Sequence, residues 1–332
     1  MLELWARFFL AAGVIILAAS SLSRNADIVA EKTGLGRAWV GVLLLPLFTS
    51  LPEIVTSAQA ALVNNPDLAL GNVLGSNMFN LMIIAVIDLV QGSGPILRYV
   101  RPGHILTASI GVMLAGFTAF AVLAGGFGTI PFLKIGYGSL VIVLLFLAGL
   151  RLIVRYERRH RDPEQLQRLY AGKSLPLALT LMLVAGVLIV FSGRGLALAA
   201  DEISRVTALG GTFVGTFMMA IATSLPELVA TIAAVRLGAL DMAVGNILGA
   251  NVMNMIIIVA ADGFYRQGSI LAGASSTVAV AAVLAMMLTA IVIIGLIYKS
   301  NKSYLFLGLD AYSIIILYLA GAFFLYRLGL SL

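Results

Sequence analysis

The sequence predicts an all-α integral membrane protein in which ten transmembrane helices form two inverted five-helix repeats. Two observations predict this fold class. Ten apolar segments are each long enough to cross a bilayer. A motif-bearing stretch in the first half also recurs in the second half at a constant offset of 174 residues.

Composition already excludes several classes of protein. Of the 332 residues, 61% are hydrophobic and 11% charged, and the mean hydropathy is +1.06, far from the globular average. The absence of cysteine rules out disulfide frameworks and thiolate sites. Two histidines without an HExxH pattern argue against an intramembrane zinc protease. The formal net charge of +6 is better explained by loop orientation than by nucleic-acid binding.

The ten apolar segments are separated by glycine, proline or charged residues. They cover residues 5–23, 38–64, 67–90, 103–125, 131–153, 176–199, 210–238, 241–262, 272–297 and 304–327. The first is kept as a span, because it is long for a signal peptide and no clear cleavage site follows it. The chain is therefore divided into a first half (1–155), a basic loop (156–175) and a second half (176–332).

The basic residues indicate the orientation. If the N-terminus lies outside the cell, 15 of the 21 Lys and Arg residues face the cytoplasm, seven of them in the loop 151–174. This asymmetry follows the positive-inside rule and predicts a cell-membrane protein with a cytoplasmic loop. We read the loop as a determinant of topology in preference to an anionic-lipid or regulatory site.

The internal repeat is specific. Residues 49–53 (TSLPE) recur at 223–227, and GNVLGSNMFN at 71–80 recurs as GNILGANVMN at 245–254. Without gaps, residues 26–88 match 200–262 at 25 of 63 positions. Five spans separate the two copies, so the second copy is inverted in the membrane. Inverted repeats of this kind are typical of secondary transporters, whose sites lie near the midplane.

Two acidic residues lie in the middle of predicted spans. Glu53 and Glu227 have no Lys or Arg at the same depth, so a proton or a bound cation must neutralise them. Each follows a proline, which frees the carbonyl four residues earlier and predicts a kinked or unwound helix. Unwound backbone at membrane depth lines cavities and offers carbonyl oxygens to hard cations. Two bidentate Glu and two Thr carbonyls would supply six of the six to eight oxygens that calcium takes.

Further oxygen-bearing side chains accompany both motifs. Hydroxyl or carbonyl oxygens are expected from Thr49, Ser50, Thr223 and Ser224. Three further side chains are expected to face a cavity: Ser76, Asn80 and Asn254. Four other amides have two equal interpretations, as ligands or as interhelical hydrogen-bond partners: Asn72, Asn77, Asn246 and Asn251. The glycine pairs Gly71/Gly75 and Gly245/Gly249 are read as helix-packing positions. Asp67 and Asp241 are read as helix caps, and Asp88 and Asp262 as interfacial residues.

These motifs resemble the α-repeats of the sodium/calcium exchanger family within the calcium/cation antiporter superfamily, here at 38–90 and 210–262. The resemblance implies alternating access, with spans one and six sliding past the other eight. It implies calcium binding by Glu53 and Glu227 with the carbonyls of Thr49 and Thr223. The remaining residues of the set would complete sodium sites: Ser50, Ser76, Asn80, Ser224 and Asn254. No cofactor is implied, and the partners are the lipid bilayer, Ca²⁺ and Na⁺.

Several positions depart from the family pattern. Phe48 and Ala222 replace glycines, and Pro46 replaces a small residue that offers a backbone oxygen to sodium. Ala250 lacks the hydroxyl of Ser76, and Asn254 stands where many members carry Asp. Sodium/calcium exchange is the expected activity, with calcium/proton exchange as the alternative and a cation channel as a weaker one. No residue set for an enzyme is recognised.

Overall fold

The computed structural model describes residues 2–34, 37–92, 94–131, 135–160, 170, 172–206, 221–300, 303–304 and 307–330, and within them the chain is almost entirely helical. The first half contains α1 (Leu2–Thr33), α2 (Arg37–Trp39), a π-helical turn η1 (Val40–Leu44), α3 (Leu45–Thr49), α4 (Leu51–Leu62), α5 (Pro66–Gln91), η2 (Ile96–Arg98), α6 (Gly103–Leu123), η3 (Gly125–Phe127) and α7 (Tyr137–Arg159). The second half contains α8 (Leu175–Val206), α10 (Leu225–Arg236), α11 (Leu240–Phe264), α12 (Ile270–Gly273), α13 (Ser276–Tyr298), the short antiparallel strands β1 (Ser303–Tyr304) and β2 (Leu307–Gly308), and α14 (Leu309–Leu330).

The helices confirm an integral membrane architecture. Among the described residues, eight helices are long and apolar enough to cross a bilayer, and a bent pair, Val40–Thr49 with Leu51–Leu62, brings the number to nine. The predicted seventh span, 210–238, lies partly outside the described residues, which resume at residue 221. Ten spans therefore remain a prediction. The first and sixth spans are longer than predicted, because α1 and α8 each extend over 32 residues.

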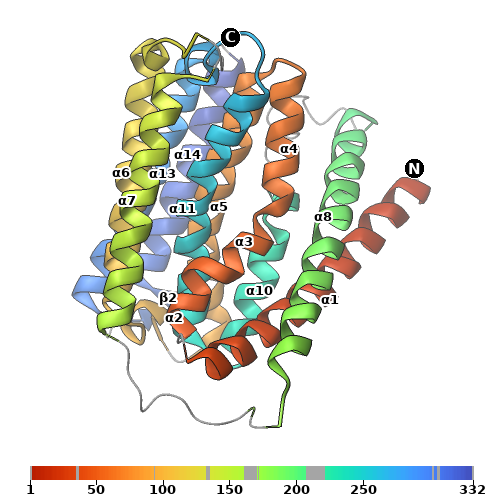
Figure 1. The fold of residues 1–332 in the computed structure, drawn as a ribbon, viewed down its shortest axis with the longest axis vertical. Coiled ribbons are helices and arrows are strands. Elements are labelled where there is room, and N and C mark those ends of the chain that lie inside the picture. Colours follow the sequence, from red (N-terminus) through yellow and green to blue (C-terminus); the bar gives the residue numbers. More distant parts are fainter. Residues whose placement is uncertain are drawn as a thin grey trace.

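The helices form two groups (Figure 1). An upright bundle contains α5, α6, α7, α11, α13 and α14, whereas α1 and α8 lie side by side at an angle to it. The shorter helices α4 and α10 lie between the two groups, α4 against α8 and α10 against α1. The molecule thus has a central bundle and a tilted helix pair, with the TSLPE segments between them.

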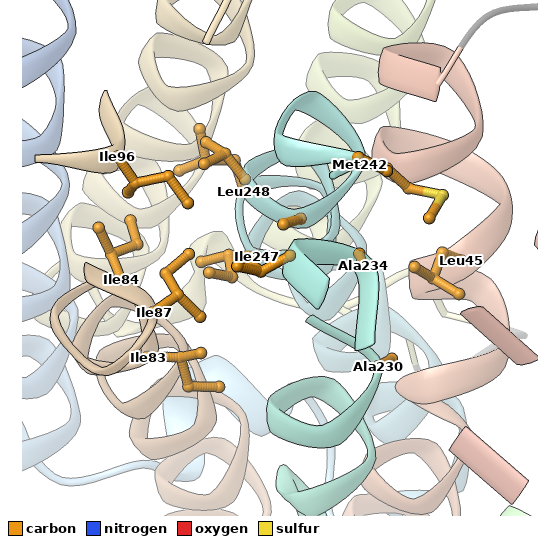
Figure 2. Packing of buried hydrophobic residues seen from close by; sticks show 14 of the residues in the cluster. Leu45, Ile83, Ile84, Ile87, Ile96, Ala230, Ala234, Met242, Ile247 and Leu248 are labelled. Carbon is orange, nitrogen blue, oxygen red and sulfur yellow. The ribbon is translucent and has the colours of Figure 1, made fainter. Parts of the chain in front are cut away.

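The core lies where α5 and α11 meet. These helices are largely apolar and are buried on most sides, which explains why neither shows a narrow apolar stripe. Figure 2 shows Ile83, Ile84 and Ile87 of α5 on one side and Ile247 and Leu248 of α11 beside them. All five side chains are buried within one cluster. This packing holds the two copies of the GN-containing motif against each other.

Glycines allow a close crossing of η1 and α11. A Cβ atom on Gly41 would lie 2.6 Å from the carbonyl oxygen of Met242. Gly245 and Gly249 face Gly41 and Val42 with similarly little space. The packing interpretation of this glycine pair is therefore confirmed. A Cβ atom on Gly71 would have no neighbour within 4 Å among the described residues. By the repeat, Gly71 should face residues 215 and 216, which lie outside the described part of the chain.

A partly buried ion pair joins the end of α1 to α2. Asp27 is 1% exposed and accepts hydrogen bonds from Nε and Nη2 of Arg37, the second at 2.9 Å. The hydroxyl of Tyr170, from the loop between the halves, also donates to Asp27 at 3.0 Å. The hydrogen bond with Asp27 raises the pKa of Arg37 above its ordinary value. Burial and the same carboxylate raise the pKa of Tyr170, so this tyrosine keeps its proton.

Four aspartates at the helix ends hold loops. Asp88 and Asp262 are 1% exposed and accept the backbone N–H of Ile96 and Ile270, positions that are themselves 174 apart. Both aspartates anchor loops at the ends of α5 and α11, and their position at the membrane interface stays a prediction. Asp67 accepts from the N–H of Ser275, and Asp241 from that of Arg101.

The capping interpretation of Asp67 and Asp241 was wrong. The α5 cap is Asn65, whose side chain accepts from the N–H of Leu68 at 3.0 Å, and no side-chain hydrogen bond caps α11. Asp241 instead contacts Nε2 of the buried His104 at 3.1 Å. Because each aspartate holds a loop of the opposite half, these residues join the two repeats.

Candidate functional site

Both TSLPE segments break a helix at the same place. Between α3 and α4 the axis bends by 48°, and Ser50 at the break has φ −83° and ψ 8°. Ser224, which precedes α10, has nearly the same conformation, φ −88° and ψ 7°. The prolines at 52 and 226 explain the break, because proline has no N–H to donate to the carbonyl four residues earlier and its ring clashes with that carbonyl. The predicted kinks are confirmed.

The breaks place Glu53 and Glu227 in the first turns of α4 and α10, where both are fully buried. The hydroxyl of Ser224 donates to Oε1 of Glu53 at 3.1 Å, and the hydroxyl of Ser50 donates to Oε1 of Glu227 at 3.1 Å. Each carboxylate therefore receives a hydrogen bond from the opposite repeat. The two residues of each pair come from segments related by the offset of 174, so the site lies on the pseudo-two-fold axis.

α5 contributes a third hydroxyl to this cluster. Ser76 donates to Oε1 of Glu53 at 3.4 Å and lies 3.5 Å from the hydroxyl of Thr223. The corresponding position on α11 is Ala250, which has no polar side-chain atom. The polar cluster around Glu53 is therefore richer in oxygen than the cluster around Glu227. The backbone at the two helix breaks is alike in both repeats, whereas the hydroxyl of Ser76 has no counterpart at Ala250.

The second motif forms a ring of amides between α5 and α11. Asn77 and Asn251 each donate to the other's backbone carbonyl, at 3.3 and 3.2 Å. Asn80 donates to Oδ1 of Asn251 at 3.1 Å, and Asn254 donates to Oδ1 of Asn77 at 2.8 Å. This geometry favours the interpretation of Asn77 and Asn251 as interhelical hydrogen-bond partners over their interpretation as ion ligands. The amides join the two repeats at the depth of the glutamates.

Asn72 and Asn246 also make interhelical contacts. Asn72 donates to the hydroxyl of Ser57 at 3.0 Å and Asn246 to that of Thr231 at 2.9 Å. Ser57 and Thr231 were missed from the sequence, although they too lie 174 residues apart. They tie α4 to α5 and α10 to α11. The repeat offset, applied to every buried hydroxyl, would have found them.

In the described part of the chain, the site contains buried oxygen atoms without a hydrogen-bond donor and no basic residue paired with the glutamates. Oε2 of both glutamates and Oδ1 of Asn80 and Asn254 are buried without a hydrogen-bond donor among the described residues. No Lys or Arg of the described part of the chain pairs with either glutamate. Buried acceptors are normally satisfied, and a buried carboxylate needs a counter-charge. Such a cluster suits a hard cation that takes oxygen ligands.

All nine residues predicted for the site are buried: Thr49, Ser50, Glu53, Ser76, Asn80, Thr223, Ser224, Glu227 and Asn254. Hydrogen bonds connect Glu53 with Ser76 and Ser224, and Glu227 with Ser50. Asn80 and Asn254 are joined to the amide ring. Among the described residues no group of three or more His, Cys, Asp or Glu side chains is placed to hold a metal. Neutral oxygens would therefore have to supply most ligands of a bound ion.

Inverted repeats that meet at two buried carboxylates define a membrane transporter for cations, and the comparisons agree. The family model for the sodium/calcium exchanger protein matches residues 3–134 and 177–326. The chain belongs to the sodium/calcium exchanger family and is a cation antiporter, not an enzyme. This also confirms the resemblance recognised from the two motifs.

The similarity to individual proteins covers most of the chain. It is 31% identical to the inner membrane protein YrbG of Escherichia coli K12 over 77% of this chain and 78% of that protein. It is 23% identical to the sodium/calcium exchanger MaX1 of Methanosarcina acetivorans over 74% and 79%, respectively. The solved structure of the sodium-calcium exchanger NCX_Mj superimposes with a TM-score of 0.72 over 96% of this chain and 98% of that chain. At 20% identity this last likeness confirms the fold.

Proposed function

We propose that this antiporter exchanges sodium for calcium by alternating access. The observation that supports this best is the crossed pair of buried carboxylates, Glu53 and Glu227, each bound by a serine of the opposite repeat. Two carboxylates together balance one divalent cation or two monovalent ones. Either cargo can therefore compensate the charge of the two buried carboxylates.

The proposed calcium ligands are the Glu53 and Glu227 carboxylates with the backbone oxygens of Thr49 and Thr223. The two threonines directly precede the helix breaks and follow Phe48 and Ala222, whose carbonyls lose their helical donor to proline. The proposed sodium ligands are the remaining polar side chains of the set: Ser50, Ser76, Asn80, Ser224 and Asn254. The unsatisfied Oδ1 atoms of Asn80 and Asn254 support their inclusion.

Calcium/proton exchange is the second candidate, and the sodium-ligand positions favour it. Asn254 is uncharged and its amide nitrogen donates to Asn77, while Ala250 brings no hydroxyl. The carbonyl of Pro46 accepts the N–H of Ser50 at 3.0 Å, so one of its lone pairs is already used. With fewer oxygens for sodium, a proton on Glu53 or Glu227 would be the alternative counter-charge.

Flux measurements separate the two candidates. Purified protein in proteoliposomes is loaded with calcium, and efflux is followed after dilution into sodium buffer, into choline buffer at equal pH, and into choline buffer with an imposed pH gradient. Sodium/calcium exchange predicts efflux in the sodium arm only. Efflux driven by the pH gradient alone would establish the second candidate. Calcium currents without any counter-ion gradient would indicate a channel and contradict both.

For orientation, we propose that the N-terminus lies outside the cell membrane and that the loop 151–174 lies in the cytoplasm. The domain division into 1–155, 156–175 and 176–332 goes with this topology. Because the chain has no cysteine, single cysteines can be introduced without background. Ser174→Cys should react with a membrane-impermeant maleimide only in inside-out vesicles, and labelling in intact cells would contradict the orientation.

A further inference from the structure

A groove runs between α1 and α10, away from the glutamate site. Its volume is about 420 Å³. Its lining includes Ile16, Ser20, Arg24, Val229, Ile232 and Arg236. Neither the sodium/calcium site nor the amide ring contributes a residue to it. The groove is therefore separate from the site described above.

The groove is apolar at one end and basic at the other. On α1 the lining residues are spaced four apart, so Ile16, Ser20 and Arg24 share one helix face. On α10, Val229 and Arg236 are seven residues apart and also share a face. Along each helix the arginine lies about 10 to 12 Å from the apolar end at 1.5 Å per residue. The groove has the polarity of a single amphipathic molecule.

The two arginines make no ion pair with the described residues. Both are exposed, and neither has a carboxylate or aromatic partner among the described residues. Two neighbouring guanidinium groups repel a cation, so the transported ion is not expected here. They attract an anion, and guanidinium groups bind phosphate oxygens in a bidentate manner.

We propose that this groove binds one anionic phospholipid, with its headgroup phosphate between Arg24 and Arg236 and an acyl chain along the apolar surface near Ile16 and Val229. The bilayer supplies such a molecule at high local concentration, and basic pockets between transmembrane helices bind anionic headgroups. In the proposed orientation the arginines lie at the cytoplasmic ends of both helices, so the lipid comes from the inner leaflet. Binding does not depend on which ions are exchanged.

Native mass spectrometry of the full chain in neutral detergent tests the proposal. The protein is titrated with phosphatidylglycerol and with phosphatidylcholine of identical acyl chains. One phosphatidylglycerol is expected to bind ahead of phosphatidylcholine. Arg24→Gln and Arg236→Gln should each weaken it about fivefold, which corresponds to about 1 kcal/mol for one basic residue near the membrane surface. Arg158→Gln, an exposed arginine at the end of α7, is the matched control and should leave binding unchanged.

A second variant tests the acyl-chain part. Ala233 also lines the groove, and Ala233→Trp should fill it and displace the lipid while both arginines remain. Melting temperatures close to that of the wild type show that a variant is folded, and Arg236→Lys replaces Arg236→Gln if the latter is not. Equal binding of the two lipids, equal losses in Arg24→Gln and Arg158→Gln, or full binding by Ala233→Trp would each overturn the proposal.

Discussion

Ser224 donates a hydrogen bond to Glu53 across 171 positions of sequence, at 3.1 Å. Its counterpart, Ser50 to Glu227, has the same length. Each repeat thus completes the carboxylate of the other, and neither half contains a finished site. This crossing explains in physical terms why serine directly precedes Leu-Pro-Glu in both copies: the helix break turns its hydroxyl toward the partner repeat.

Removing one of these hydroxyls should destabilise the ion-free protein. Ser224→Ala deletes a donor to a buried carboxylate, and hydrogen bonds to charged groups contribute about 1.5 to 3 kcal/mol. Thermal unfolding in calcium-free and sodium-free buffer measures the loss, and Ser50→Ala should match it. Ser313→Ala is the control, because Ser313 is exposed and its hydroxyl bonds within its own helix. Unchanged stability of both site variants would argue against the crossed bonds.

The amide ring should behave as one coupled unit. In a double-mutant cycle, Asn77→Ala and Asn251→Ala should show a coupling energy of about 0.6 to 1.7 kcal/mol, the range for interhelical hydrogen bonds in membranes. Unfolding in mixed micelles gives the four stabilities. Asn65→Ala removes the α5 cap and should combine additively with Asn251→Ala. Additivity in the Asn77 and Asn251 cycle would mean that the ring does not hold α5 to α11.

The η1 and α11 crossing should not tolerate a side chain at Gly41. A Cβ there meets the backbone of Met242 at 2.6 Å, and overpacking of this kind costs about 1 to 3 kcal/mol. Gly41→Ala should therefore lower the melting temperature. Gly13→Ala on α1, where no atom lies within 4 Å among the described residues, should be neutral or slightly stabilising. Equal effects of the two substitutions would contradict the close approach.

Replacing one member of the partly buried Asp27–Arg37 pair should destabilise the protein more than replacing both. Arg37→Gln removes the charged partner of the buried Asp27, and because the Arg37 side chain is 35% exposed, the loss should lie below the roughly 3 to 5 kcal/mol of a fully buried pair. The double variant Asp27→Leu with Arg37→Leu should recover most of this loss, because no charge is left uncompensated. Thermal unfolding compares the three proteins. A double variant as unstable as Arg37→Gln would show that the contact serves more than charge balance.

Sequence patterns were sufficient for the eight or nine apolar spans that the structure describes, the repeat, both helix breaks and the burial of the nine site residues. Hydropathy and proline act over a few residues, so their effects can be read locally. The partners of Asp88, Asp241 and Asp27 could not be predicted, because they are backbone N–H groups or side chains of loops whose position depends on the whole fold. The same reason left Asn77 undecided: an amide can be a ligand or a helix contact, and only the facing residue distinguishes them.

The asymmetry of the site was visible at Ala250, but its consequence required the structure. Ser76 contacts both Glu53 and Thr223, so the missing hydroxyl at 250 removes the equivalent contacts near Glu227. The choice between sodium and proton coupling depends on this kind of detail. Flux under defined gradients decides that choice, whereas the location of the site can be tested by binding alone.

Equilibrium calcium binding by isothermal titration calorimetry tests the central claim, that Glu53 and Glu227 together hold the transported cation. Wild-type protein should bind one calcium per chain. Glu53→Gln and Glu227→Gln each remove one of the two charges that compensate the cation, and each should weaken binding at least tenfold, about 1.4 kcal/mol. Glu3→Gln at the exposed start of α1 should not. Calcium binding of wild-type strength in both site variants would contradict the claim.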